Sequence, residues 1–313
     1  MRTYINRLPV NGPWGGGNLF VGAFHKRAPA LCDLVIDQTG RTPIDVILLA
    51  GLDNDGYGIS VDQAVMYKMY AKPDCQIVLR VNENDARKDT THMDDMLVKV
   101  SEHLDGTVFV SKWLQEYFND KGWQCKNQAV IINGVASDVF APQPKLNNGK
   151  LNIVAHHWSD NRLKGADIYE RIDQFVGEHP DKFAFTYIGR HQCDFHHTTV
   201  VKPLAGKALG QELGKHDIYV SASKADPGPN HILEALSCGL PTHVSRDGGG
   251  CVEFAGDDHT FRDWNDLEAM LLGGGCGPNT RGVTLRPWLP CVQEYIDFLE
   301  ATWKASQSGS QLS

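Results

Sequence analysis

The sequence lacks long apolar runs, and it contains fewer basic than acidic residues. No stretch reaches the roughly 18 apolar residues of a membrane-spanning helix, so we expect no transmembrane segment. The first ten residues also lack the apolar core of a signal peptide. Among 313 residues, 30 are Lys or Arg and 38 are Asp or Glu, a formal net charge of −8. That balance excludes a broad nucleic-acid-binding face, although it allows a local basic pocket.

Cysteine pairs at metal-binding or redox spacing are also missing. None of the eight cysteines belongs to a Cys-x-x-Cys pair, and several lie in apolar runs. A segment containing His191, Cys193, His196 and His197 fits no standard zinc spacing. We therefore expect free, buried cysteines, no metal site, and a cytoplasmic protein.

Short apolar runs alternate with amphipathic segments along the whole chain. Several runs, such as FAFTYIG, are apolar on both faces, which is typical of parallel strands buried between helices. The alternation predicts an α/β protein with doubly wound sheets. The predicted strands cover residues 3–7, 45–50, 76–81, 107–111, 129–132, 152–156, 183–189, 217–223 and 242–245, and predicted helices include 19–27, 61–70, 93–103, 166–177, 230–238 and 292–304.

A single linker-like segment divides the pattern into two halves. Residues 141–150 (APQPKLNNGK) combine prolines, asparagines and a glycine without apolar periodicity. We expect one Rossmann-like domain over 1–145 and a second over 150–288, with a last helix at 291–304 packing back on the first. Two such domains facing each other leave a cleft at the carboxyl ends of their strands, where α/β proteins bind ligands.

The segment from residue 217 to residue 256 carries the clearest chemistry. A predicted strand leads into Asp226, and a helix then begins after Pro229 and ends before Gly239. The start of that helix offers free backbone N–H groups and a positive dipole end, which suit a diphosphate. Glu234 follows Asp226 by eight positions, so two carboxylates flank the anion site and suit hydroxyl groups on either side of it.

Four motifs in this order resemble those of the retaining GT-B glycosyltransferases of family 4. The most specific is an acidic residue, seven further residues and then Glu. The other three motifs occur in the order and at the spacing that the family shows. They are Asp226 with Glu234-Ala235-Leu236-Ser237-Cys238-Gly239-Leu240-Pro241, Ile132-Asn133-Gly134-Val135 with Asp138 and Phe140, Asn161-Arg162-Leu163-Lys164-Gly165, and Gly249-Gly250 with Glu253.

The resemblance implies a GT-B fold and transfer of a sugar, with retained anomeric configuration, from a nucleotide sugar in the cleft. The donor, most simply a UDP- or GDP-sugar, is a substrate, and neither a cofactor nor a metal is required. The implied catalytic residues are Asp226, Lys164 and Arg162; the implied donor-binding residues are Glu234, Asn230, His231, Gly228, Gly16, Gly17 and Arg190. Lys164 and Arg162 would hold the phosphates, Glu234 the ribose and Asp226 the sugar.

The first half contains a glycine-rich segment, residues 12–18 (GPWGGGN), after its first strand. In the resembling family such a loop borders the donor phosphates and the acceptor. The predicted acceptor-side residues are Arg80, Asn82, Asp85 and Asn18, and the acceptor itself, whether carbohydrate, lipid, protein or nucleobase, stays open. A dinucleotide-binding loop is an alternative, but the G-x-G-x-x-G spacing is absent.

The sequence departs from the family pattern at three positions. Asp226 stands where the family usually has Glu, Pro229 stands at its glycine, and Trp158 replaces an arginine six residues before Lys164. Pro229 lacks a phosphate-facing N–H, which the Asn230 side chain is able to replace. Three alternatives therefore stay open: a GT-B sugar-nucleotide epimerase or hydrolase, a non-catalytic nucleotide-sugar-binding module and, third, a dehydrogenase.

Overall fold

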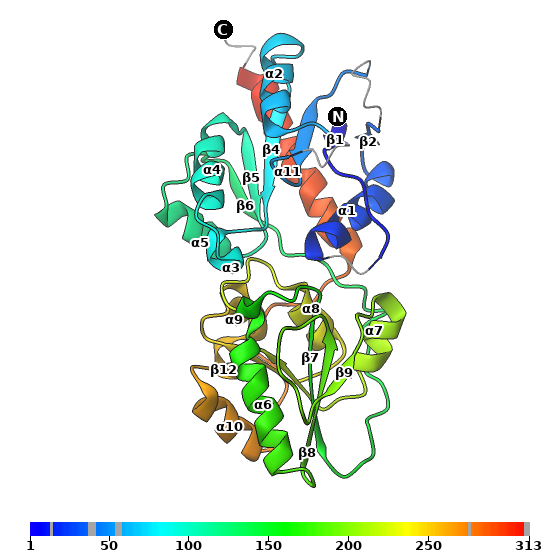
Figure 1. The fold of residues 1–313 in the computed structure, drawn as a ribbon. Coiled ribbons are helices and arrows are strands. Elements are labelled where there is room, and N and C mark those ends of the chain that lie inside the picture. The colour runs from blue at the N-terminus through cyan, green and yellow to red at the C-terminus, as the bar shows by residue number, and fades with distance from the viewer. Residues whose placement is uncertain (13–14, 37–41, 54–57, 275–276, 310–313) are drawn as a thin grey trace.

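Two parallel β-sheets, one in each half of the chain, organise the computed structural model (Figure 1). The structure describes residues 1–12, 15–36, 42–53, 58–274 and 277–309; Pro13 and Trp14 of the glycine-rich segment and Cys276 lie outside them. The first sheet has the order β2-β1-β3-β4-β5-β6 and the second the order β12-β11-β10-β7-β8-β9, with every pair parallel. Both have the order reversal of doubly wound folds, which places ligand sites at the carboxyl edge.

The first sheet is covered by helices on both faces. Its strands are β1 (Arg2–Ile5), β2 (Asp33–Leu34), β3 (Val46–Leu49), β4 (Gln76–Val81), β5 (Gly106–Phe109) and β6 (Gln128–Val130). One face packs against α2 (Val61–Tyr70), α4 (Met93–Val100) and α5 (Lys112–Asp120), and the other against α1 (Gly16–Arg27) and α11 (Trp288–Gly309). Short α3 (Asp85–Lys88) follows β4. Burial on both faces explains why these strands are apolar throughout.

The second sheet has the same three-layer arrangement. Its strands are β7 (Leu151–His157), β8 (Phe183–Gly189), β9 (Thr199–Val201), β10 (Ile218–Ser221), β11 (Thr242–Ser245) and β12 (Thr260–Phe261). One face packs against α6 (Ala166–Glu178) and α10 (Trp264–Leu272), and the other against α7 (Gly206–Leu213), α8 (Asn230–Ser237) and α9 (Gly250–Ala255). Among the described helices, none is long and apolar enough to cross a membrane.

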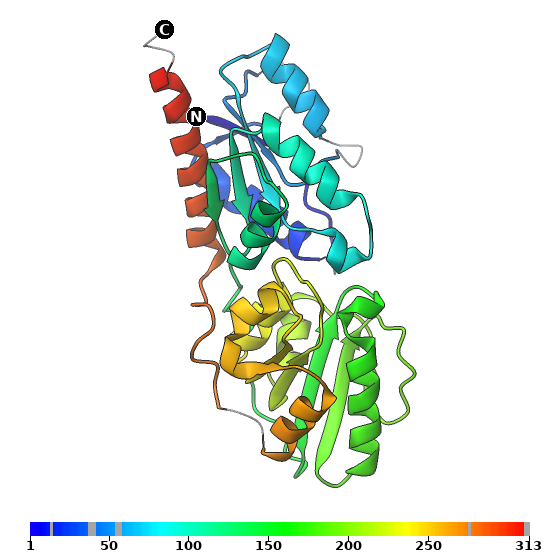
Figure 2. The same cartoon turned by 90° about the vertical axis from the view of Figure 1, so that its left-hand side faces the viewer.

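The chain passes between the halves twice. It leaves the first sheet after β6 and returns along an extended segment to α11, which runs beside the first sheet (Figure 2). The apolar side of α11 includes Cys291, Val292, Tyr295 and Leu299, which are buried against β4, β5 and α1. The core of the first half is therefore built from two segments distant in the sequence. All seven described cysteines are free, and five of them are buried.

Candidate functional site

A cavity of about 320 Å³ lies between the two sheets, at the carboxyl ends of their strands. In the first half its walls come from the segments after β1, β4 and β6. In the second half they come from the last residues of β8 and from the segments after β7, β9 and β10. Seven predicted site residues line it: Lys164, Asp226, Gly228, Asn230, His231, Glu234 and Gly16. The structure therefore brings the donor-signature residues and one glycine of the first half to one cavity.

A buried cluster of charged groups occupies the cavity wall. Lys164 Nζ, in a short 3-10 helix after β7, lies 2.6 Å from Asp226 Oδ2, and both residues are buried. Arg87 Nε, from α3 of the first half, lies 3.5 Å from the same oxygen. Burial acts to raise the pKa of Asp226, but the Lys164 and Arg87 charges outweigh it and hold that pKa below its ordinary value. Asp226 is therefore an ionised anchor between two cations.

Arg87 was not among the predicted site residues. It follows β4 in a short polar helix, where the sequence shows an ordinary solvated segment. Its role depends on an ion pair with a residue 139 positions away in the chain. No local pattern signals such a contact, and the only hint is its position after a strand's carboxyl end.

Glu234 is held by a histidine at the end of β7. His156 Nε2 donates to Glu234 Oε2 at 2.9 Å, and both residues are buried. The predicted strand 152–156 ends at His156, and the sequence did not predict this pairing. The histidine fixes one carboxylate oxygen and leaves the other without a protein partner among the described residues, so Glu234 keeps an acceptor at the cavity.

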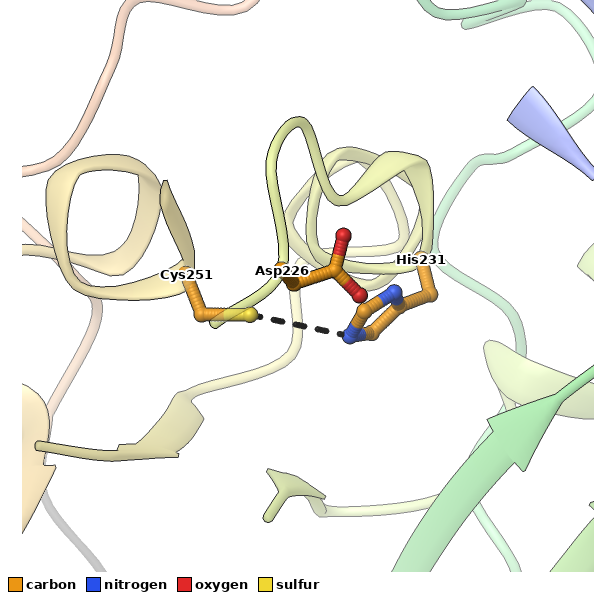
Figure 3. A group of neighbouring side chains, drawn as sticks. All are labelled: Asp226, His231 and Cys251. Atoms are coloured by element: carbon orange, nitrogen blue, oxygen red, sulfur yellow. Dashed lines mark hydrogen bonds between the residues drawn. The ribbon is translucent and has the colours of Figure 1, made fainter. Parts of the chain in front are cut away.

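Asp226, His231 and Cys251 form a buried group in the wall (Figure 3). Their potential ligand atoms lie within 4.8 Å of one another, a spacing that a metal ion can bridge. His231 Nε2 also contacts Ser221 Oγ at 2.9 Å, with Cys251 Sγ at 4.0 Å. Burial and then the Lys164 charge lower the pKa of His231. Because Lys164 and Arg87 already supply two positive charges to Asp226, a divalent cation there would meet strong repulsion.

Glycine at two cavity positions lets the two halves approach each other closely. A Cβ on Gly228 would lie 2.5 Å from Val110 Cγ2, and one on Gly16 would lie 2.9 Å from Asn230 Nδ2. Glu253 adds to this contact, because its carboxylate accepts from the backbone N–H groups of Lys112 and Trp113 at the start of α5. The signature residues after β10 and β11 thus face the first half across a tight interface.

Two arginines predicted at the donor site, Arg162 and Arg190, lie outside the cavity lining. Arg162 has 56% of its side chain exposed, donates to the Gln192 carbonyl and lies 3.7 Å from Glu170. Arg190 is exposed and stacks on the Trp158 ring at 4.1 Å. Lys164 and Arg87 are therefore the cations that this geometry places at the site.

The predicted acceptor-side residues and Gly17 also lie outside the lining. Arg80 is 2% exposed and hydrogen-bonds to Tyr295 and Asn133 within the protein. Asp85 accepts from the backbone of α4, and Asn18 hydrogen-bonds to the Val10 backbone. Asn82 lies beside Gly17. Arg80 and Asp85 thus make hydrogen bonds within the protein, and their contact with an acceptor stays a prediction.

We predict that the protein loses stability when the pH falls from about 6.5 toward 4, because buried neutral histidines resist protonation. Burial lowers the pKa of His157, His231 and His216, and lowers that of His243 to about 4. Each depressed pKa gives stability that is present above the unfolded value and lost on acidification, by up to about 1.4 kcal/mol per pH unit. Denaturant unfolding across this range measures the slope. In His243→Phe the slope should be shallower; an unchanged slope would contradict the assignment.

Comparison with known proteins decides the fold. No protein-family model matches the sequence, and no curated protein matches it. Among solved structures, Anabaena HepE in complex with UDP and glucose has a TM-score of 0.65 at 11% identity, covering 99% of this chain and 100% of that chain. Sucrose-phosphate synthase from Thermosynechococcus elongatus has a TM-score of 0.61 at 14% identity, covering 99% and 98%.

TarM of S. aureus is similar over part of its length. Its TM-score is 0.53 at 10% identity, and the match covers 84% of this chain and 51% of that chain. These structural neighbours have the two-domain GT-B architecture. The chain has the GT-B fold. At such identities the likeness shows the fold alone, and the predicted GT-B architecture, two Rossmann-like sheets facing a central cleft, is confirmed.

Proposed function

We propose that this GT-B protein is a glycosyltransferase that moves a sugar from a nucleotide sugar to an acceptor with retention of configuration. The observation that carries the proposal is the cluster of Lys164, Arg87 and Asp226 beside Glu234, in a cavity between the two sheets. Cations suited to phosphates stand next to carboxylates suited to hydroxyl groups. The structure of HepE, which has a similar fold, holds UDP-glucose in one complex.

In the proposed reaction, the bond between the anomeric carbon and the diphosphate oxygen breaks, and its electron pair leaves with the nucleoside diphosphate. Lys164, Arg87 and the backbone N–H groups at the start of α8 stabilise that developing charge. The acceptor oxygen forms the new bond on the same face, and its proton passes to the departing phosphate oxygen. Asp226 orients the sugar, and Glu234 accepts a hydrogen bond from the ribose hydroxyl groups. Because the acceptor oxygen itself attacks the anomeric carbon, no protein nucleophile is needed.

The two halves have separate tasks in this proposal. Residues 150–288 would bind the donor, because Lys164, Asp226 and Glu234 all come from this part of the chain. Residues 1–145, together with the helix at 291–304, would bind the acceptor and supply Arg87. Closure of the two domains around the bound substrates would exclude water and so protect the donor from hydrolysis.

We predict that metal chelation leaves the transfer rate unchanged. The reason is that Lys164 and Arg87 already provide the positive charge that a divalent ion supplies in metal-dependent transfer. The measurement is product formation with and without EDTA after removal of free metal. A loss of activity that added Mg²⁺ or Mn²⁺ restores would contradict the metal-independent mechanism.

A panel of nucleotide sugars tests the proposed function. The thermal unfolding midpoint should rise with one nucleotide sugar and with its nucleoside diphosphate, and stay constant with NAD or NADP. That donor should then be consumed only when an acceptor is present. Consumption without acceptor would indicate an epimerase or hydrolase, stabilisation without turnover would indicate a binding module, and no stabilisation by any member would overturn the proposal.

A further inference from the structure

A chain of side-chain hydrogen bonds runs from the C-terminal helix to the cavity. It begins at Tyr295 on α11, whose hydroxyl accepts from Arg80 Nε at 3.1 Å. Arg80 Nη2 donates to Asn133 Oδ1 at 3.0 Å, and Asn133 Nδ2 donates to Asn230 Oδ1 at 2.7 Å. These four residues come from α11, β4, the loop after β6 and the start of α8, so the chain joins the two halves of the protein.

The chemistry of arginine fixes the direction of every bond in this chain. A guanidinium has donors and no acceptor, so Asn133 must turn its oxygen toward Arg80. Its NH₂ group then faces Asn230, which must present its own oxygen in return. The Asn230 NH₂ group is left at the far end, and its buried Nδ2 has no hydrogen-bond partner among the residues that the structure describes. Leaving a buried donor unsatisfied is costly, and such groups in native structures call for an explanation.

The surroundings of this donor favour an anionic oxygen. Asn230 begins α8 and Gly16 begins α1, and both line the cavity. A Cβ on Gly16 would lie 2.9 Å from Asn230 Nδ2, so the positive ends of two helices meet at the donor.

The other end of the chain adds positive charge. Arg80 is buried over the Phe20 ring and forms no ion pair within the described part of the chain. A positive charge without a counter-ion at the start of a hydrogen-bond chain polarises each amide in turn, which strengthens the next hydrogen bond. The terminal NH₂ group of Asn230 is therefore a stronger donor than an isolated amide.

We propose that Arg80 and Asn133 position the Asn230 amide as a hydrogen-bond donor to a phosphate oxygen of the bound nucleoside diphosphate. Asn230 is the contacting residue, and Arg80 and Asn133 act through it. This inference rests on the proposed function, because it assigns a contact of the donor phosphates. It also gives Arg80 a task at the site that needs no direct contact with a substrate.

The variant Asn133→Asp tests the direction of the chain. The new carboxylate still accepts from Arg80 and pairs with its charge, so the thermal midpoint should stay the same or rise. A carboxylate has no NH₂ group to donate, so the Asn230 amide must flip and donate its own NH₂ group to residue 133. The Asn230 oxygen, an acceptor, then faces the ligand. Affinity for the tighter of UDP and GDP should fall by about 10- to 100-fold, the range for a hydrogen bond to a charged group. Affinity for the matching nucleoside, which has no phosphate, should stay constant.

Two further variants complete the experiment. Asn230→Ala removes the amide donor without placing an oxygen toward the ligand. It should lower the affinity for the diphosphate and leave the affinity for the nucleoside constant. Asn119→Asp makes the same charge change at an exposed position of α5 and should alter neither affinity. Unchanged diphosphate affinity in Asn133→Asp and Asn230→Ala, or an equal loss for the nucleoside, would overturn the inference. Failure of the wild type to bind either diphosphate would instead overturn the proposed function on which it rests.

Discussion

Replacing Lys164 by alanine is expected to lower the rate of sugar transfer by about 10²- to 10³-fold, the usual cost of losing one preorganised group that stabilises transition-state charge. Lys164 is buried at the cavity and stands 2.6 Å from Asp226. Without its charge, the departing diphosphate keeps only Arg87, the Asn230 side-chain amide and the backbone N–H groups at the start of α8. Single-turnover transfer at saturating donor measures the effect on the chemical step.

The same replacement weakens the fold, so the rate must be measured on folded protein. Removing one partner of a buried ion pair costs about 3–5 kcal/mol. Circular dichroism at the assay temperature should show native helix content before the rates are compared. Lys224→Ala is the matched control, because Lys224 has 42% of its side chain exposed and pairs only loosely with Asp167. A folded Lys164→Ala enzyme that turns over at the wild-type rate would refute the proposed role.

Replacing Glu234 by alanine is expected to raise the KM for the donor by about 100-fold, which corresponds to about 2.7 kcal/mol of lost hydrogen bonding to the ribose. His156 holds one oxygen of this carboxylate, so the other is available to a ligand at a fixed position. Steady-state kinetics with varied donor measures the change. The effect should fall mainly on KM, because the ribose contact exists before and during transfer.

A donor lacking the 2′- and 3′-hydroxyl groups isolates this contact. The wild type should bind the dideoxy nucleoside diphosphate about as weakly as Glu234→Ala binds the normal one. The variant should then show little further loss with the dideoxy compound, since the partner of those hydroxyls is already gone. If the affinity lost through Glu234→Ala and the affinity lost through the missing hydroxyl groups simply added, Glu234 would act elsewhere in the site.

Sequence patterns predicted the central strands well because their chemistry is local. Strands β4, β8 and β11 lie where the continuous apolar runs placed them. The edge strands β2, β9 and β12 were missed because they have only two or three residues, too few to produce a periodic signal. The predicted helix at 61–70 matches α2, whose start has a capping box between Ser60 and Gln63.

Most of the predicted site residues that the fold brings to the cavity belong to the linear motifs. Lys164, Asp226 and Glu234 belong to linear motifs, and the fold brings them to the cavity. Arg80 shows what the motif cannot supply. It stands one residue from the carboxyl end of β4, which indicated a cleft residue, but alternate side chains of a strand face opposite sides. Like Val78, it points to the face that α1 and α11 cover.

The position of α11 has a consequence for biosynthesis. Its residues Tyr295 and Leu299 fill the core between α1 and β4, yet the ribosome reaches them only after the whole second sheet has been translated. During translation the earlier half therefore exposes an apolar groove while the later half is able to complete its own sheet. Nascent chains released before α11 would present that groove to chaperones and proteases, so quality control should remove them although their second half is complete.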